Sequence, residues 1–219
     1  MVTTFSKYFF FFGVTQCFAR SSNAKTTTID DQDFINQTLA GQTQAFAVLV
    51  ERYKDLVFTL ALRMLKNREE AEEVSQDTFI KVYKKLGSFK GDSKFSTWVY
   101  KIAYNACLDR LKTYEKERNK VGIDKFNTHK IKTLETAFDG LIAKEKAMAV
   151  QRCLDLLPSE DSALLTLFYF EDQSLEEIAV VLGITPNNAK VKLFRSRKKL
   201  ASIFKLHLEP EIISQYERS

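Results

Sequence analysis

Turn-forming residues and metal ligands are scarce in this chain. Its 219 residues include only seven glycines and three prolines, which argues against an all-β fold with many tight turns and against collagen-like proteins. The three cysteines, Cys17, Cys107 and Cys153, lie far apart, and only two histidines accompany them. So few ligands cannot assemble a zinc or haem site. We therefore expect reduced cysteines in a cytoplasmic protein that carries no metal and no cofactor.

The residues that are present are those of an ordinary globular protein. Hydrophobic residues make up 45% and charged residues 28% of the chain, which is not the composition of a disordered protein. The length suits one large domain or two small ones. The formal net charge of +5 is only mildly basic, so local clusters of charge are more informative about binding partners than the net charge is.

The most apolar run lies at the N-terminus, at residues 8–14. It is much shorter than the roughly 18 apolar residues that a membrane-spanning helix needs. A lysine in front of it weakly imitates a secretory signal, and a polar stretch without periodicity follows. We expect residues 1–29 to be a disordered extension, with an export signal as the less favoured alternative.

Helical periodicity organises the rest of the chain into two blocks. Apolar residues recur at helical spacing over 45–65, 69–86 and 95–111, with short connections between these segments. This pattern predicts an antiparallel helical cluster without strands. A second block starts near Leu141, and in it Ser159 is expected to cap a helix that follows Pro158. The predicted boundaries are an extension at 1–29, a first domain at 30–112, a linker at 113–140, a second domain at 141–206 and a tail at 207–219.

The sharpest motif is a predicted helix-turn-helix at residues 174–200. Ser174 and Glu177 form a capping box at the start of a short helix. A turn with Gly183 follows, and Thr185 and Pro186 then suit the N-cap and first position of a longer helix. A short capped helix, a turn and a longer basic helix are typical of this DNA-binding motif.

The longer helix has no acidic residue between Gly183 and His207. Its apolar stripe of Ala189, Leu193 and Leu200 is expected to face the shorter helix. Asparagine and arginine can bond adenine and guanine edges, and the remaining cations suit phosphates. The alternative is a solvated basic face without a DNA role. The residues that we expect to contact DNA are Asn187, Asn188, Lys190, Val191, Phe194, Arg195, Arg197 and Lys198.

Two further clusters lie in the first block. Five carboxylates crowd the helix at 69–77, where they would suit a basic protein partner or serve only as a solvated face. Aromatic and cationic residues alternate over 89–110, as single-stranded nucleic acid requires. By spacing, Trp98 is expected in the core, whereas Tyr100 and Tyr104 are expected to lie off the buried stripe. No phosphate-binding loop or catalytic triad is present, so we expect no enzyme.

Two sets of motifs resemble bacterial sigma factors. Residues 70–79 and 89–105 are similar to region 2 of these proteins. Residues 156–158, 174–179 and 190–197 resemble region 4. Regions 2 and 4 joined by a short linker, without regions 1 and 3, resemble the extracytoplasmic-function (ECF) sigma factors. The resemblance implies an all-α fold of two small helical domains joined by a flexible linker.

The resemblance also implies partners and roles. Partners would be core RNA polymerase, through its β′ clamp helices and β subunit, promoter DNA and an anti-sigma factor, with no stable homo-oligomer. The helix from Asn187 would read the promoter −35 element. Polymerase binding would fall to Glu72, Glu73, Gln76 and Asp77. Recognition and melting of the −10 element would fall to Asp92, Ser93, Lys94, Trp98, Lys101, Tyr104, Asn105 and Arg110.

The chain departs from the family pattern in places. Tyr83 stands where tryptophan is frequent, and Val191 stands where a small polar residue is common. The departure at Val191 allows a −35 sequence that differs from familiar ones. Two alternatives to a sigma factor are a helix-turn-helix regulator that acts without polymerase and an interaction adaptor without a DNA role. The acidic helix and the aromatic segment argue against the first, and the acid-free helix argues against the second.

Overall fold

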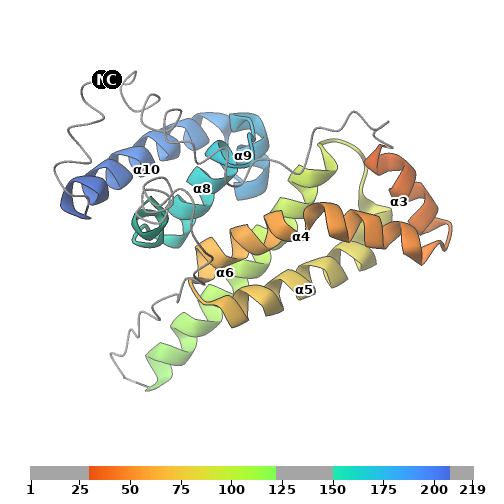
Figure 1. Cartoon of the computed structure of the whole chain (residues 1–219), viewed down its shortest axis with the longest axis horizontal. Helices are drawn as coiled ribbons and strands as arrows, with labels where there is room; N and C mark the ends of the chain where they lie inside the picture. Colours follow the sequence, from red (N-terminus) through yellow and green to blue (C-terminus); the bar gives the residue numbers. More distant parts are fainter. Residues whose placement is uncertain (1–29, 122–149, 208–219) are drawn as a thin grey trace, which may run out of the picture.

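The computed structural model describes residues 30–121 and 150–207, and all its regular elements there are helices (Figure 1). The expected extension at 1–29, most of the expected linker and nearly all of the expected tail lie outside the described residues. The helices are α3 (Asp31–Leu39), α4 (Thr43–Leu65), α5 (Arg68–Lys85), η1 (Leu86–Ser88), α6 (Phe95–Val121), α8 (Ser159–Tyr169), α9 (Leu175–Leu182) and α10 (Pro186–His207).

The first domain is a bundle in which α4 packs against α3, α5 and α6. Lys66 ends α4 in the left-handed conformation, at a φ of 56°. Asn67 then caps α5, because its side-chain oxygen accepts a hydrogen bond of 3.0 Å from the backbone N–H of Glu70. These two residues therefore turn the chain between two antiparallel helices, as the sequence predicted.

Helix α6 is longer than expected. It continues to Val121, past the predicted domain boundary at 112 and into the expected linker. Its final turns are rich in Lys, Glu and Arg, residue types with high intrinsic helix propensity. The apolar period fades there because the helix has left the bundle, so periodicity alone placed its end too early.

The second domain contains α8, α9 and α10, preceded by helical residues 150–155. The predicted capping box is present: Glu177 N–H donates to the Ser174 hydroxyl, and Ser174 N–H donates to the Glu177 carboxylate. Gly183 ends α9 at a φ of 68°. The Thr185 hydroxyl accepts from Asn188 N–H at 3.2 Å. The helix-turn-helix is confirmed in each of these details.

The prediction that Ser159 caps a helix is wrong. Pro158 is the N-cap of α8, and Ser159 is its first residue. The Ser159 hydroxyl instead donates a 2.6 Å hydrogen bond to the carbonyl of Met64, at the end of α4. A partner in the other domain therefore replaces the local cap.

The two domains pack directly against each other (Figure 1). Helix α8 lies against α4, and α9 lies against α6, so buried apolar side chains from both domains form one continuous core. None of the helices in the described part of the chain is long and apolar enough to cross a membrane.

Candidate functional site

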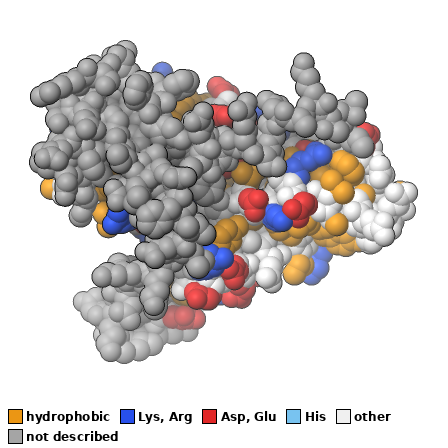
Figure 2. All heavy atoms as spheres, in the orientation of Figure 1, with side chains coloured by type: hydrophobic (Ala, Val, Ile, Leu, Met, Phe, Trp, Pro, Cys, Tyr) orange, Lys and Arg blue, Asp and Glu red, His pale blue; other side chains and the backbone are white. Residues whose placement is uncertain are grey.

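The acidic residues of α5 form an exposed face. Ala71, Val74, Ser75 and Thr78 are buried against the bundle, so the other residues between 71 and 78 point outward. Acidic side chains gather where α5 and α6 lie side by side (Figure 2). The four expected polymerase-binding residues are all exposed: Glu72, Glu73, Gln76 and Asp77.

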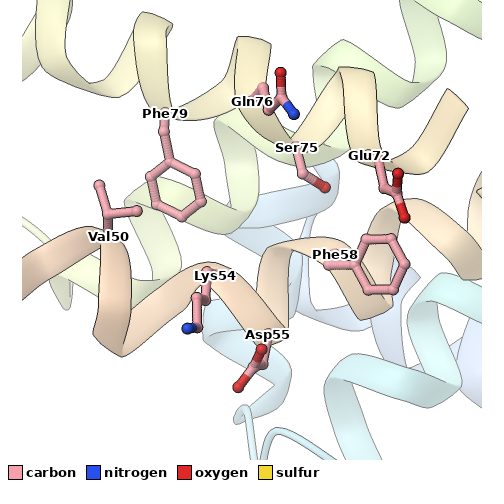
Figure 3. Close-up of a pocket in the computed structure, with 8 residues that line it drawn as sticks. All are labelled: Val50, Lys54, Asp55, Phe58, Glu72, Ser75, Gln76 and Phe79. Carbon is pink, nitrogen blue, oxygen red and sulfur yellow. The ribbon is translucent and has the colours of Figure 1, made fainter. Parts of the chain in front are cut away.

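An open groove lies beside this face, between α4 and α5 (Figure 3). Its walls are largely apolar, and charged side chains stand at its edge, so it suits a partner that presents an apolar side chain flanked by cations. The sequence pattern does not predict the contribution of α4, because Phe58 lies off the buried stripe of that helix and only the fold brings it opposite α5. The lining residues are Val50, Lys54, Asp55, Phe58, Glu72, Ser75, Gln76 and Phe79.

Arg110 links the acidic face to α6. Its guanidinium lies 2.9 Å from the Glu70 carboxylate and 2.7 Å from that of Glu73. The hydrogen bond that Arg110 donates to Glu73, with the charges of both acids, raises the pKa of Arg110. The structure thus pairs a residue expected at the −10 element with one expected at polymerase.

Trp98 packs in an aromatic cluster at the start of α6. Its ring centroid lies 5.4 Å from that of Phe89 and 5.7 Å from that of Phe95. Trp98 is only half-buried, whereas Phe95 is buried, so part of the indole remains accessible. The other exposed or half-buried residues expected at the −10 element on this loop and helix are Asp92, Ser93, Lys94, Lys101 and Asn105.

The expectation that Tyr100 and Tyr104 lie off the buried stripe is wrong. Their exposed fractions are 1% and 3%. Helix α6 is covered by the bundle on one side and by the second domain on another, a packing that one amphipathic stripe could not predict. Burial raises the pKa of Tyr104, with a smaller contribution from Glu160 of α8.

The residues at the start of α6 bond to the second domain. Tyr100 donates a 2.8 Å hydrogen bond to the Glu171 carboxylate, and Thr97 donates one of 3.2 Å to the Gln173 side chain. Lys94 lies 2.8 Å from the Glu177 carboxylate. Burial raises the pKa of Glu171, although the Tyr100 hydroxyl opposes this shift. These contacts with the second domain involve Lys94, Thr97 and Tyr100, whereas Lys101 and Asn105 of the expected DNA-binding set remain exposed.

Helix α10 presents most of its expected DNA-contact residues to solvent. Its stripe of Ala189, Leu193 and Leu200 is buried, as predicted. Val191 and Phe194 are exposed despite being apolar, at 41% and 59%. The other exposed members of the expected set are Asn187, Asn188, Lys190, Arg195 and Lys198.

Three cations of α10 are engaged inside the second domain. Arg197 lies over the rings of Phe168 and Tyr169, at 5.1 and 5.3 Å from their centroids. Lys192 pairs with Glu160. Lys199 lies 2.5 Å from the Asp161 carboxylate. These interactions hold α10 against α8 and give Arg197 a packing role that the sequence did not reveal.

The two described cysteines, Cys107 and Cys153, are buried and unbridged. Burial raises the pKa of Cys107 to about 12 and that of Cys153 to about 11, so both thiols are protonated near neutral pH and are poor nucleophiles. Within residues 30–121 and 150–207, no group of His, Cys, Asp and Glu side chains is arranged to hold a metal ion.

Each of the two domains matches a family model. Residues 49–117 match sigma-70 region 2, and residues 147–200 match sigma-70 region 4. The chain is 31% identical over 172 residues to the ECF RNA polymerase sigma factor SigW of Bacillus subtilis, covering 76% of this chain and 92% of that protein. This chain belongs to the ECF family of RNA polymerase sigma factors, so it is not an enzyme.

Two further relatives are also RNA polymerase sigma factors. The RNA polymerase sigma-H factor of Pseudomonas aeruginosa is 29% identical, with 80% of this chain and 93% of that protein covered. The ECF RNA polymerase sigma-E factor of Escherichia coli K12 is 28% identical, with coverages of 78% and 93%.

Two solved structures share the fold. One is the sigma factor RpoE in complex with the anti-sigma factor NepR from Bartonella quintana, at a TM-score of 0.60 and 19% identity, covering 73% of this chain and 96% of that one. The other is CnrH in complex with the cytosolic domain of CnrY, at a TM-score of 0.54 and 21% identity, with coverages of 80% and 97%.

Proposed function

We propose that this sigma factor docks on core RNA polymerase through α5 and reads a promoter with α6 and α10. The observation that carries this proposal is the segregation of charge. A dense cluster of exposed acids lies on α5 of one domain, and an exposed face without acids lies on α10 of the other. One molecule therefore offers a basic protein partner and a DNA duplex two separate surfaces.

Polymerase binding is assigned to Glu72, Glu73, Gln76 and Asp77, together with the groove between α4 and α5. The exposed carboxylates would meet cations on the β′ clamp helices, and complementary charge would steer the encounter. The groove, with Phe58 and Phe79 in its walls, would take an apolar side chain of the same partner. Burial of such an anchor supplies much of the affinity of an interface.

Reading of the −35 element is assigned to the exposed face of α10. Asn187, Asn188 and Arg195 carry the donors and acceptors that distinguish bases in the major groove. Lys190 and Lys198 suit phosphates, which fix the register of the helix. Val191 and Phe194 lie on the same exposed face, where apolar side chains suit thymine methyl groups. Arg197 joins this set only if it leaves the rings of Phe168 and Tyr169.

Recognition of the −10 element is assigned to the loop before α6 and to the start of that helix. Asp92, Ser93 and Lys94 lie on the loop, and Lys101 and Asn105 are exposed on the helix. The accessible part of Trp98 offers a ring for stacking, worth about 1–3 kcal/mol per base. Tyr104 and Arg110 belong to this proposal as well, although Tyr104 is buried and Arg110 is ion-paired in the structure.

Regulation by an anti-sigma factor and a cytoplasmic location complete the proposal. One sigma factor with the same fold, RpoE of Bartonella quintana, was solved in complex with the anti-sigma factor NepR, and the exposed α5 face is a surface that such a partner would cover. A cytoplasmic location follows from the proposed work on core polymerase and promoter DNA. We do not expect a stable homo-oligomer.

The test is transcription with purified components. The full chain is mixed with core polymerase and a fragment library of its source genome, and the transcript starts are sequenced. We expect starts that depend on the chain and share two upstream elements. Tight duplex binding by the chain alone, with no new starts, would contradict the proposal and favour a regulator that acts without polymerase.

A further inference from the structure

One carboxylate of the second domain is buried and bonds the helix proposed to read the −35 element. Asp161, in the first turn of α8, is 5% exposed. One of its oxygens accepts a 2.5 Å hydrogen bond from the Ser196 hydroxyl, and the other lies 2.5 Å from the Lys199 ammonium. Ser196 and Lys199 both belong to α10, and neither is in the set proposed to contact DNA. A single side chain therefore joins α8 to α10 through two bonds.

These two bonds restrict the orientation of α10. Ser196 and Lys199 are three residues apart, so they lie on one face of the helix. The neighbouring stripe of Ala189, Leu193 and Leu200 is buried as well, but apolar contact is non-directional. A hydrogen bond, in contrast, weakens steeply when its angle departs from a straight line. Asp161 therefore limits rotation of α10 about its axis more sharply than the stripe does.

This limit reaches the residues proposed to read bases. Arg195 is exposed and is the immediate neighbour of buried Ser196, so a rotation that breaks the bonds of Asp161 also turns Arg195. A rotation of about 30° moves a Cα atom by about 1.2 Å, at a helix radius of about 2.3 Å. Hydrogen bonds form over a range of distances only about 0.5 Å wide. Base contacts by Arg195 therefore need the orientation that Asp161 maintains.

Net stability alone explains this buried carboxylate poorly. A buried ion pair is often no more stabilising than apolar side chains of the same volume, and the best-attested use of buried polar groups is to fix the register of packed helices. The neighbouring acid, Glu160, makes a contrasting contact. Glu160 is exposed, and its ion pair with Lys192 lies at the surface, where such pairs contribute little. The two adjacent acids of α8 therefore have different roles.

We infer that Asp161 is a positioning residue for recognition of the −35 element. Through Ser196 and Lys199 it sets the orientation of α10 on α8, and this orientation decides which base sequence Arg195 and its exposed neighbours prefer. Because Asp161 is itself buried, it acts through α10 and not by contact with DNA. The inference rests on the proposed −35 role of α10.

The test measures sequence preference, which a loss of folded protein would not change. Holoenzyme made from core polymerase and the full chain transcribes a pool of tagged templates that share the mapped −10 element and carry all sequences at the mapped −35 positions. Sequencing the transcripts gives the relative yield of each template. We expect Asp161→Ala to lower the advantage of the best −35 sequence roughly tenfold, as loss of one good base contact would. Glu160→Ala removes the neighbouring charge and should keep the preference of the parent.

Variants at Lys199 keep the inference testable if Asp161→Ala fails to fold. Lys199→Met keeps a long apolar stem but loses the ammonium that pairs with Asp161, so it should lower the preference in the same direction by a smaller factor. Lys199→Arg keeps a cation at this position and should preserve most of the preference. Circular dichroism shows whether each variant remains folded.

Distinct results would overturn distinct assignments. If Asp161→Ala reduced the yield of all templates in equal proportion and left their ranking unchanged, Asp161 would serve stability only, and the inference would fail while the proposed function stood. The same preference in Lys199→Met and the parent would also overturn it. Parent holoenzyme that transcribes all −35 sequences equally would overturn the −35 assignment of α10 and the inference with it. A complete lack of starts that depend on the chain would overturn the proposed function itself.

Discussion

Two arginines of the same helix have different surroundings. Arg195 of α10 is exposed, whereas Arg197 lies over the rings of Phe168 and Tyr169 at the C-terminal end of α8. A guanidinium over a ring contributes about 0.5–2 kcal/mol, depending on its solvation. The same residue type is therefore available for the proposed DNA contact at position 195 and serves packing at position 197.

This difference predicts a separation of effects. Arg195→Ala should weaken binding to a −35 duplex by about 1–3 kcal/mol and leave the free energy of unfolding unchanged. Arg197→Ala should lower the free energy of unfolding by about 1 kcal/mol. Fluorescence anisotropy with duplex DNA and urea unfolding measure the two quantities. Lys205→Ala, near the other end of α10, is the control for loss of one charge. Equal duplex affinity in Arg195→Ala and the parent would refute the assignment.

Gln76 and Asp77 are exposed next to each other on α5. Replacing both with alanine should reduce the ability of the chain to compete with a labelled sigma factor for core polymerase, since both belong to the proposed docking face. Duplex binding by α10 should not change, because that surface lies in the other domain. Glu117→Ala removes a charge from an exposed position on α6, outside the proposed docking face, and this variant should compete normally. Normal competition by the double variant would disprove the docking assignment.

At the scale of elements, the turn of the helix-turn-helix depends on one backbone conformation. Gly183 has a φ of 68°, and no atom beyond the adjoining residues lies within 4 Å of the position that a Cβ would take. Any cost of a side chain there comes from the backbone alone, about 1–2 kcal/mol for a residue in the left-handed region. Gly87 lacks a positive φ, and a Cβ there would meet only a methyl of Leu39, at 3.7 Å.

The two glycines therefore make a matched pair. Gly183→Ala should lower the free energy of unfolding by about 1 kcal/mol, and Gly183→Asn should lose less, because asparagine tolerates this conformation. Gly87→Ala should be nearly neutral or slightly stabilising. Thermal unfolding followed by circular dichroism gives the comparison. If Gly87→Ala destabilised the protein more than Gly183→Ala, the conformational explanation of the turn would be wrong.

At the scale of the whole molecule, one chain carries both proposed DNA-binding surfaces. Simultaneous use of two tethered sites raises affinity through effective concentration, but only when the geometry lets both engage. Because a duplex turns once in about 10.5 base pairs, inserting roughly 5 base pairs moves one element to the opposite face.

The spacing of the two promoter elements should therefore control transcription by the holoenzyme. Inserting about 5 base pairs between the mapped −35 and −10 elements should reduce the transcript yield by tenfold or more. The same insertion upstream of the −35 element should have no effect. Run-off transcription measures both templates. A promoter that tolerates the internal insertion would show that the two surfaces act independently.

Local patterns in the sequence predicted neither α3 nor the end of α6, but they determined α4, α5, the first turns of α6, the two-residue turn at Lys66 and Asn67, and the helix-turn-helix with its capping box. Each of these depends on residues within a few positions of one another, through hydrogen bonds of the backbone and an apolar stripe. The motifs of regions 2 and 4 likewise lie in continuous segments, so the family is recognisable from the order of the amino acids alone.

Only the tertiary structure decided which side chains remain available. It buried Tyr100 and Tyr104, moved the Ser159 hydroxyl to Met64 and placed Arg197 over aromatic rings. It also brought Phe58 of α4 opposite α5 and Glu171 against Tyr100. These outcomes depend on contacts between segments distant in sequence, and a helical period specifies one buried face but not a second one. Packing between the two domains therefore decides which parts of a recognisable sigma factor are exposed.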